Sequence, residues 1–112
     1  MKTIKYPDFE KVIICTGTIL KCNPNVKARK PAYIFEIDFG SKWGKKTSSA
    51  QLTDNYLPED LIGKQIVAVM NFEPKRIAGI KSEVLILGVS NQYNSIVLLH
   101  PERKVENGVI VC

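Results

Sequence analysis

The feature that most constrains the fold is the alternation of apolar and polar residues between positions 33 and 40. Every second position is aromatic or aliphatic: Tyr33, Phe35, Ile37 and Phe39. Because successive side chains of a strand point to opposite faces, this pattern predicts a half-buried antiparallel strand. A chain of 112 residues, 45% of them hydrophobic, is large enough for one core. We therefore expect a single domain over residues 1–112 built largely from strands.

The rest of the chain divides into short segments that are rich in β-branched and aromatic residues. The expected strands are 12–22, 33–39, 45–50, 65–72 and 82–89, with a last hairpin formed by 95–99 and 109–111. Gly17 indicates a bulge or bend in the first strand. Apolar residues around Pro58 predict one or two helical turns within 51–63, and residues 8–11 predict one turn at most.

The order of these segments indicates a particular all-β architecture. Five principal strands, with a short helical segment between the third and the fourth, predict an OB-fold, a five-stranded Greek-key barrel with short helical segments. Segments 65–72 and 82–89 are apolar on both faces, so we expect them to be central, and 71–79 is expected to connect them. A β-sandwich or an SH3-like barrel would have the same periodicity.

The residues of common catalytic and metal sites are sparse. His100 is the only histidine, and the three cysteines lack a CxxC spacing, so we expect no metal, no cofactor, no catalytic residue and no enzyme activity. Residues 40–47 resemble a phosphate-binding loop, but three residues rather than four separate the glycines, and Lys46 follows Lys45 where Ser or Thr is needed. An odd number of cysteines, no signal peptide and no long apolar run predict a cytoplasmic protein with free thiols and no membrane span.

Positive charge is concentrated in two regions of the chain. The net charge is +5, and six cations but only two acids lie between Lys27 and Lys46. The second group is Lys75, Arg76 and Lys81. Such a distribution favours a polyanionic partner, to which the neighbouring serines and glutamine would allow a close approach. Trp43, at a turn, could stack on a base or pack against the rim of the barrel.

The segment 71–85, NFEPKRIAGIKSEVL, resembles the signature of the tRNA-binding domain family. That family includes the domain appended to methionyl-tRNA synthetases and the endothelial-monocyte-activating-polypeptide domain. Segments 9–19, 37–40 and 46–51, with 97–99 and 107–108, resemble its CsaA-like branch over nearly the whole chain. Ala78 and Val84-Leu85 depart from many synthetase-linked members and also favour that branch.

The resemblance implies an OB-fold, a homodimer and two binding activities. The first is a chaperone activity, the binding of unfolded or preprotein polypeptide in protein export. The alternative is a free-standing accessory protein that binds the outer corner of tRNA by its shape and phosphates. Apolar residues near the termini, Ile4, Tyr6, Val109 and Ile110, could supply the dimer interface or close the barrel.

The resemblance also implies where a nucleic acid would bind. The matching positions are Ser48, Ser49, Gln51, Asn71, Lys75, Arg76, Ser82 and Glu83, with Lys45 and Lys46 adjacent and Lys81 added from the second basic group. For Asn71 and Glu83 there is a second interpretation, in which their side chains hold the loop by hydrogen bonds.

Overall fold

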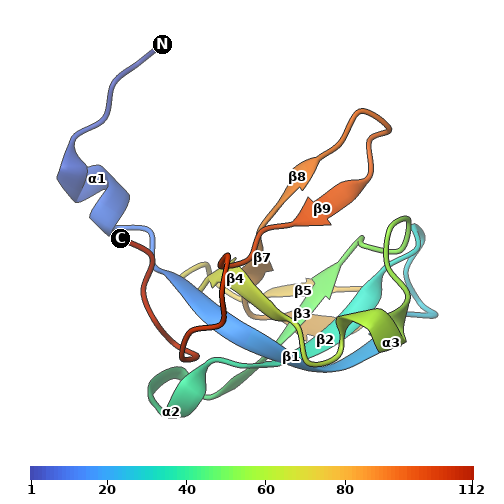
Figure 1. Ribbon diagram of the computed structural model, residues 1–112. Coiled ribbons are helices and arrows are strands. Elements are labelled where there is room, and N and C mark those ends of the chain that lie inside the picture. The colour runs from blue at the N-terminus through green and yellow to red at the C-terminus, as the bar shows by residue number, and fades with distance from the viewer.

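The computed structural model describes residues 1–112, which form nine strands and three short helices (Figure 1). The strands are β1 Ile14–Pro24, β2 Tyr33–Asp38, β3 Lys45–Ala50, β4 Gln65–Val69, β5 Lys75–Ile77, β6 Ile80–Ser82, β7 Leu85–Ile86, β8 Gly88–Ser90 and β9 Ile96–Leu98. The helices are α1 Tyr6–Glu10, α2 Gly40–Trp43 and α3 Pro58–Leu61. None of them is long and apolar enough to cross a membrane.

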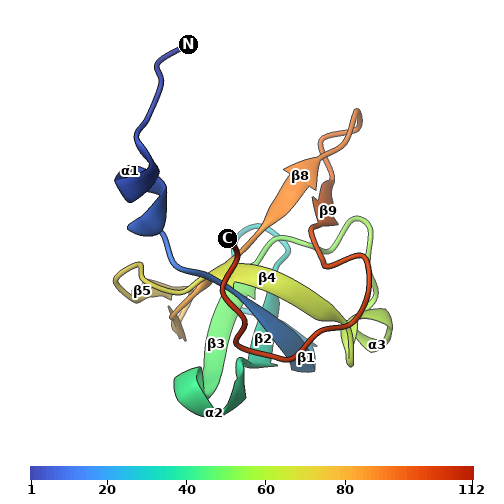
Figure 2. The ribbon, with the colours of Figure 1, turned by 60° about the vertical axis from the view of Figure 1, so that its left-hand side comes forward.

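Five strands form one antiparallel sheet in the order β3-β2-β1-β4-β7, which curls into a barrel (Figures 1 and 2). The barrel closes between β3 and the residues just before β7, where Glu83 N donates to Thr47 O over 2.8 Å, next to the hydrogen bond from the Ser48 hydroxyl to Val84 O at 2.9 Å. Helix α3 lies between β3 and β4 in the chain. This arrangement confirms the predicted OB-like fold.

The core confirms the alternation that dominates the sequence. Phe35, Ile37 and Phe39 are fully buried, while the residues between them are only partly buried. A Cβ atom on Gly17 would lie 2.6 Å from two ring carbons of Phe39, so this glycine allows β1 and β2 to pack closely. The predicted bulge at Gly17 is wrong in position, because the register between β1 and β2 shifts between Ile19 and Lys21.

The C-terminal part of the chain differs from the prediction. Strand β9 pairs with β8, and residues 109–111 lie along β1 instead, with Thr16 N donating to Val109 O over 3.0 Å. The Asn91 side chain accepts the N–H groups of Tyr93 and Ser95, which closes a local turn between β8 and β9. This nearby partner makes the predicted hairpin of 95–99 with 109–111 wrong.

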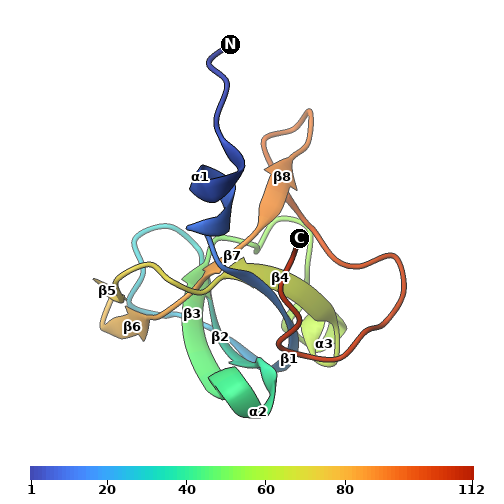
Figure 3. The same cartoon turned by 90° about the vertical axis from the view of Figure 1, so that its left-hand side faces the viewer.

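The predicted strand 82–89 is also wrong as one element. It contains the end of β6, all of β7 and most of β8, which pair with β5, β4 and β9 in turn. The connection 71–79 therefore contains β5, and β7 is at an edge of the sheet, whereas β4 is central as expected. Helix α1 and the hairpin β8–β9 project from the same end of the barrel (Figure 3).

Candidate nucleic-acid interface

The hairpin β5–β6, which closes in a tight turn, carries four of the predicted site residues: Lys75, Arg76, Lys81 and Ser82. Ala78 and Gly79 have φ of 46° and 83°, as expected for a two-residue turn that matches the twist of its strands. Lys75 pairs with Ser82, Arg76 with Lys81 and Ile77 with Ile80. Because side chains alternate between faces, Arg76 and Lys81 share the exposed outer face, opposite the half-buried isoleucines.

Arg76 and Lys81 are like charges placed directly across two strands. Side chains in such a position have Cβ atoms about 4.5–5.5 Å apart, and like charges there destabilise the pair. Neither belongs to any of the three ion pairs of the chain, Lys11–Asp8, Lys21–Glu36 and Arg103–Glu102. The Arg76 guanidinium donates to Gly79 O at 3.3 Å, which also holds it on the hairpin. The outer face therefore presents two uncompensated cations that an anionic ligand would neutralise.

Three predicted polar residues fasten this hairpin to β3. The Ser82 hydroxyl accepts the Ser49 N–H at 3.1 Å, and the Glu83 carboxylate accepts the Thr47 N–H at 2.8 Å. Ser48 is only 1% exposed, and its hydroxyl is bonded inside the barrel seam. These contacts place Ser48, Ser82 and Glu83 in the support of the hairpin.

Asn71 has a similar structural environment. Its side-chain oxygen accepts the Ile13 N–H at 2.9 Å, and its side-chain nitrogen donates to Lys11 O at 2.7 Å. Asn71 thus links the start of the 71–79 segment to the residues before β1. These bonds, with those of Glu83, match the second interpretation, in which the two side chains hold the loop.

The loop 25–32, between β1 and β2, brings further cations to the hairpin. Asn25 closes this loop, since its N–H donates to Ala32 O at 2.9 Å and its side-chain oxygen accepts the Lys27 N–H at 3.1 Å. A Cβ on Gly79 would lie 3.5 Å from the Lys27 side chain, so the loop and the hairpin tip touch (Figure 3). The sequence shows the charge of Lys27, Arg29 and Lys30, but only the fold shows that they border the hairpin.

A groove of about 960 Å³ lies between this loop, the end of β3 and the segment 85–88. Its lining is largely aliphatic and includes Leu52, Ile77, Leu85, Ile86 and Ile96, with Ser49 and Gln51 beside them. Lys27, Arg29 and Lys30 supply the only charged side chains of the lining. Such a volume is within the usual range of ligand sites.

Lys45 and Lys46 are not brought to the hairpin cations. They begin β3, and about 13 Å of strand separates Lys45 from Ser49, the β3 residue bonded to Ser82. Next to them, Trp43 packs against the core, and the Lys42 ammonium lies 4.9 Å from its ring centre. Trp43 thus has the rim-packing position that was one of its two predicted roles.

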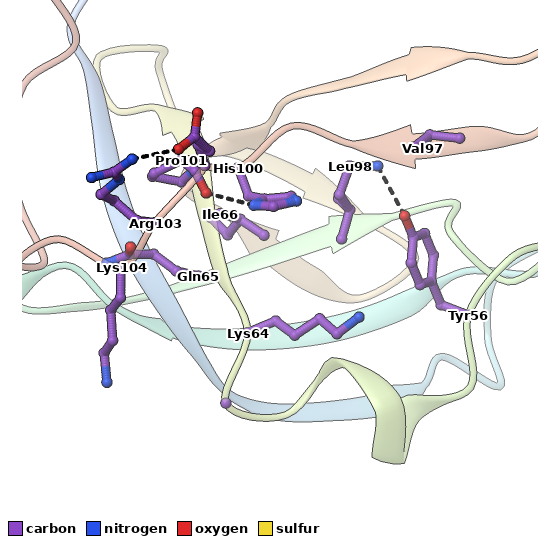
Figure 4. Close-up of a pocket in the computed structure, with 12 residues that line it drawn as sticks. Tyr56, Lys64, Gln65, Ile66, Val97, Leu98, His100, Pro101, Arg103 and Lys104 are labelled. Atoms are coloured by element: carbon purple, nitrogen blue, oxygen red, sulfur yellow. Dashed lines mark hydrogen bonds and ion pairs between the residues drawn. The ribbon is translucent and has the colours of Figure 1, made fainter.

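A second cavity, of about 420 Å³, is lined by Tyr56, Lys64, Ile66, Leu98 and His100 among others (Figure 4). Its polar groups hold the fold: the Tyr56 hydroxyl accepts the Leu98 N–H at 3.0 Å, and His100 Nδ1 lies 2.7 Å from Pro101 O. No group of three His, Cys, Asp or Glu residues is placed to hold a metal ion.

Comparisons with known proteins agree with this geometry. The family model described as "Putative tRNA binding domain" matches residues 14–109. The methionine–tRNA ligase of Parabacteroides distasonis is 36% identical over 107 residues, which are 96% of this chain and 15% of the ligase. The chain therefore spans about one-seventh of the ligases that it matches.

Two solved structures match along their whole length. The chaperone CsaA of Bacillus anthracis is 47% identical, with a TM-score of 0.92 over 99% of this chain and 100% of that one. The CsaA chaperone of Picrophilus torridus is 44% identical, with a TM-score of 0.92 over 98% and 100%. With the OB-like barrel and the cationic hairpin, these matches show that the chain belongs to the tRNA-binding domain family and is a CsaA-like member of it.

Proposed function

We propose that this protein is a non-enzymatic, cytoplasmic binding protein that holds folded RNA of the tRNA type on the outer face of hairpin β5–β6. The observation that carries the proposal is the cross-strand pair of Arg76 and Lys81, which has no acidic partner. An RNA phosphate between the two side chains would turn this repulsion into attraction. The description of the family supports tRNA as the partner.

Within this proposal the predicted site residues have different roles. Arg76 and Lys81 would contact phosphates on the outer face, and Lys27 at the hairpin tip would extend that surface. Lys75, on the opposite face of β5 with Ile77, would add positive charge at the edge of that surface. Ser48, Ser82, Glu83 and Asn71 would position the hairpin through their hydrogen bonds. Lys45 and Lys46, farther along β3, would be reached only by a ligand as long as a folded RNA.

A homodimer is part of the same proposal. A monomer of 12.6 kDa is expected to expose about 6,200 Å², whereas this chain exposes 7875 Å². Exposed apolar side chains occur on the N-terminal segment with α1 and on hairpin β8–β9, which project at one end of the barrel, and on the C-terminal segment along β1: Ile4, Tyr6, Val89, Val97, Val109 and Ile110. A second copy covering this end would bury them and double the number of phosphate contacts. Sedimentation equilibrium tests the assembly, and a monomer at micromolar concentration would contradict it.

Binding of unfolded or preprotein polypeptide in export is the second candidate function. The likeness to two CsaA chaperones over their whole length supports it. The aliphatic lining of the groove supports it independently, because apolar side chains of an extended chain need such a surface.

The test of RNA binding is a titration of labelled bulk tRNA, followed by fluorescence anisotropy at several salt concentrations. Arg76→Ala/Lys81→Ala is expected to weaken binding and to reduce the slope of log K against log salt by about 0.9 for each lost phosphate contact. Arg103→Ala/Lys104→Ala removes the same formal charge away from the hairpin and serves as the control. Equal slopes for the two double variants would contradict the proposal.

A further inference from the structure

The barrel seam between β3 and β7 is closed at one end and open at the other. The closed part consists of the bonds from Thr47, Ser48 and Ser49 to residues 82–84. Beyond Ser49 and Val84, no hydrogen bond joins the two edge strands. The groove lies there, since its lining includes residues 49–52 from one side and 85–88 from the other.

The register of β7 determines which of its backbone groups face this opening. Leu87 N donates to Val67 O at 3.0 Å, and Ile86 is paired with Ala68. In an antiparallel ladder the hydrogen-bonded pairs alternate with non-bonded pairs. The pair Ile86–Ala68 is therefore non-bonded, so the N–H and C=O of Ile86 point away from β4, and no group of the chain bonds them.

The register of β3 gives the same result on the opposite side. Phe39 N donates to Gly44 O, and the alternation that follows turns the backbone groups of Ser49 away from β2. The Ser49 N–H is used by Ser82, but the Ser49 C=O has no partner in the chain. The groove is thus bordered by two strand edges with unused hydrogen-bonding groups.

We propose that this groove binds an extended polypeptide segment, which adds to the Ile86 edge of the barrel as a further strand. The inference rests on the second candidate function and specifies how the polypeptide would be held. Main-chain bonds to Ile86 would fix the segment, and every second side chain would lie on the aliphatic lining around Leu52, Leu85 and Ile96.

The lining also indicates the chemistry of the bound segment. Its three cations are Lys27, Arg29 and Lys30, and it contains no acidic side chain. It also contains no aromatic residue, whereas sites for unstacked bases generally use aromatic rings. The groove therefore favours a polypeptide that alternates apolar and acidic residues, and RNA remains on the outer face of the hairpin.

The experiment uses a labelled short peptide that alternates valine with glutamate, and a set of the same peptide in which an ester replaces one amide at a time. Strand addition predicts a position-specific effect: the ester that removes the N–H donated to the Ile86 C=O weakens binding about 2- to 10-fold, and esters at positions that face neither Ile86 nor Ser49 have little effect. Equal binding by all the esters would overturn strand addition. A matched peptide of valine and lysine is expected to bind at least 10-fold more weakly.

Variants of the protein locate the site and separate it from the RNA surface. Leu85→Asp is expected to abolish peptide binding and to leave the affinity for tRNA unchanged, since Leu85 is 49% exposed in the groove and does not lie on the outer face of the hairpin with Arg76 and Lys81. Leu57→Asp, at a comparably exposed leucine outside the groove, is the control. A loss of tRNA binding with Leu85→Asp would assign the groove to RNA and overturn the inference. If the peptide fails to bind wild-type protein while tRNA binds, the inference fails and the RNA function stands.

Discussion

Replacing Lys81 by glutamate should make the protein more stable while it weakens RNA binding. In the native hairpin Lys81 is opposite Arg76, and no carboxylate compensates either charge. Lys81→Glu removes this repulsion and creates an opposite-charge pair at the same position. A cross-strand pair of this kind contributes about 0.2–1 kcal/mol in either direction, so the change from repulsion to attraction amounts to about 0.4–2 kcal/mol.

The Coulomb energy gives a similar magnitude. Two unit charges about 5 Å apart in water interact by about 0.8 kcal/mol. Reversing the sign of one charge turns this repulsion into an equal attraction, so the interaction energy changes by twice that amount. For a chain of 112 residues a gain of about 1 kcal/mol corresponds to a rise in Tm of about 4 °C. Because both side chains are exposed, the gain should become smaller as salt screens the charges.

The assay is urea unfolding, followed by circular dichroism at one protein concentration, together with tRNA anisotropy. Lys2→Glu, in the exposed N-terminal segment, makes the same change in net charge and is the control. The double variant Arg76→Glu/Lys81→Glu restores a like-charge pair and should lose the gain. If Lys81→Glu unfolds at the same urea concentration as Lys2→Glu, or retains full affinity for tRNA, the reasoning is refuted.

Three further predictions concern the fold around the site. Gly17→Ala should destabilise the protein by about 1–3 kcal/mol in urea unfolding, because the new Cβ would lie 2.6 Å from the Phe39 ring; unchanged stability would show that the ring moves freely. Asn71→Ala removes the two bonds to Lys11 and Ile13, and should lower stability by about 1–2 kcal/mol with faster amide exchange at Ile13; normal exchange there would argue against its structural role. Burial raises the pKa of Cys22 from 9.0 to about 11, so the folded state holds this proton more tightly than the unfolded state, and stability to urea should fall as the pH rises from about 9 to about 11. Cys22→Ala should have a flatter profile over that window, and an identical slope would contradict this assignment.

The fold was predictable where the pattern of neighbouring residues determines the structure. The alternation of β2 marks both the strand and its buried face, and β3 pairs with β2 through the short helix α2 that joins them. The residues of a strand do not by themselves determine which other strand it pairs with. The apolar run 82–89 does not indicate that its pieces pair with three different strands, nor that residues 109–111 pair with β1 instead of β9.

The candidate site was predictable in its residue types more than in its geometry. The cations of the 71–85 segment were identified, but their cross-strand position depends on the turn at Ala78 and Gly79. Lys27, Arg29 and Lys30 were visible only as excess charge, because the barrel must close before their loop reaches the hairpin. The fold likewise separates Lys45 from that group, because Lys45 is the first residue of β3, whereas Ser49, which is bonded to the hairpin, lies near the other end of that strand.

The most direct test of the central claim is amide hydrogen exchange of the protein with and without bulk tRNA. If RNA binds the outer face of hairpin β5–β6, the amides of residues 75–82 should be protected in the complex, and those of 85–88 in the groove should exchange as in the free protein. Protection confined to the groove, or no protection of the hairpin at saturating tRNA, would contradict the account.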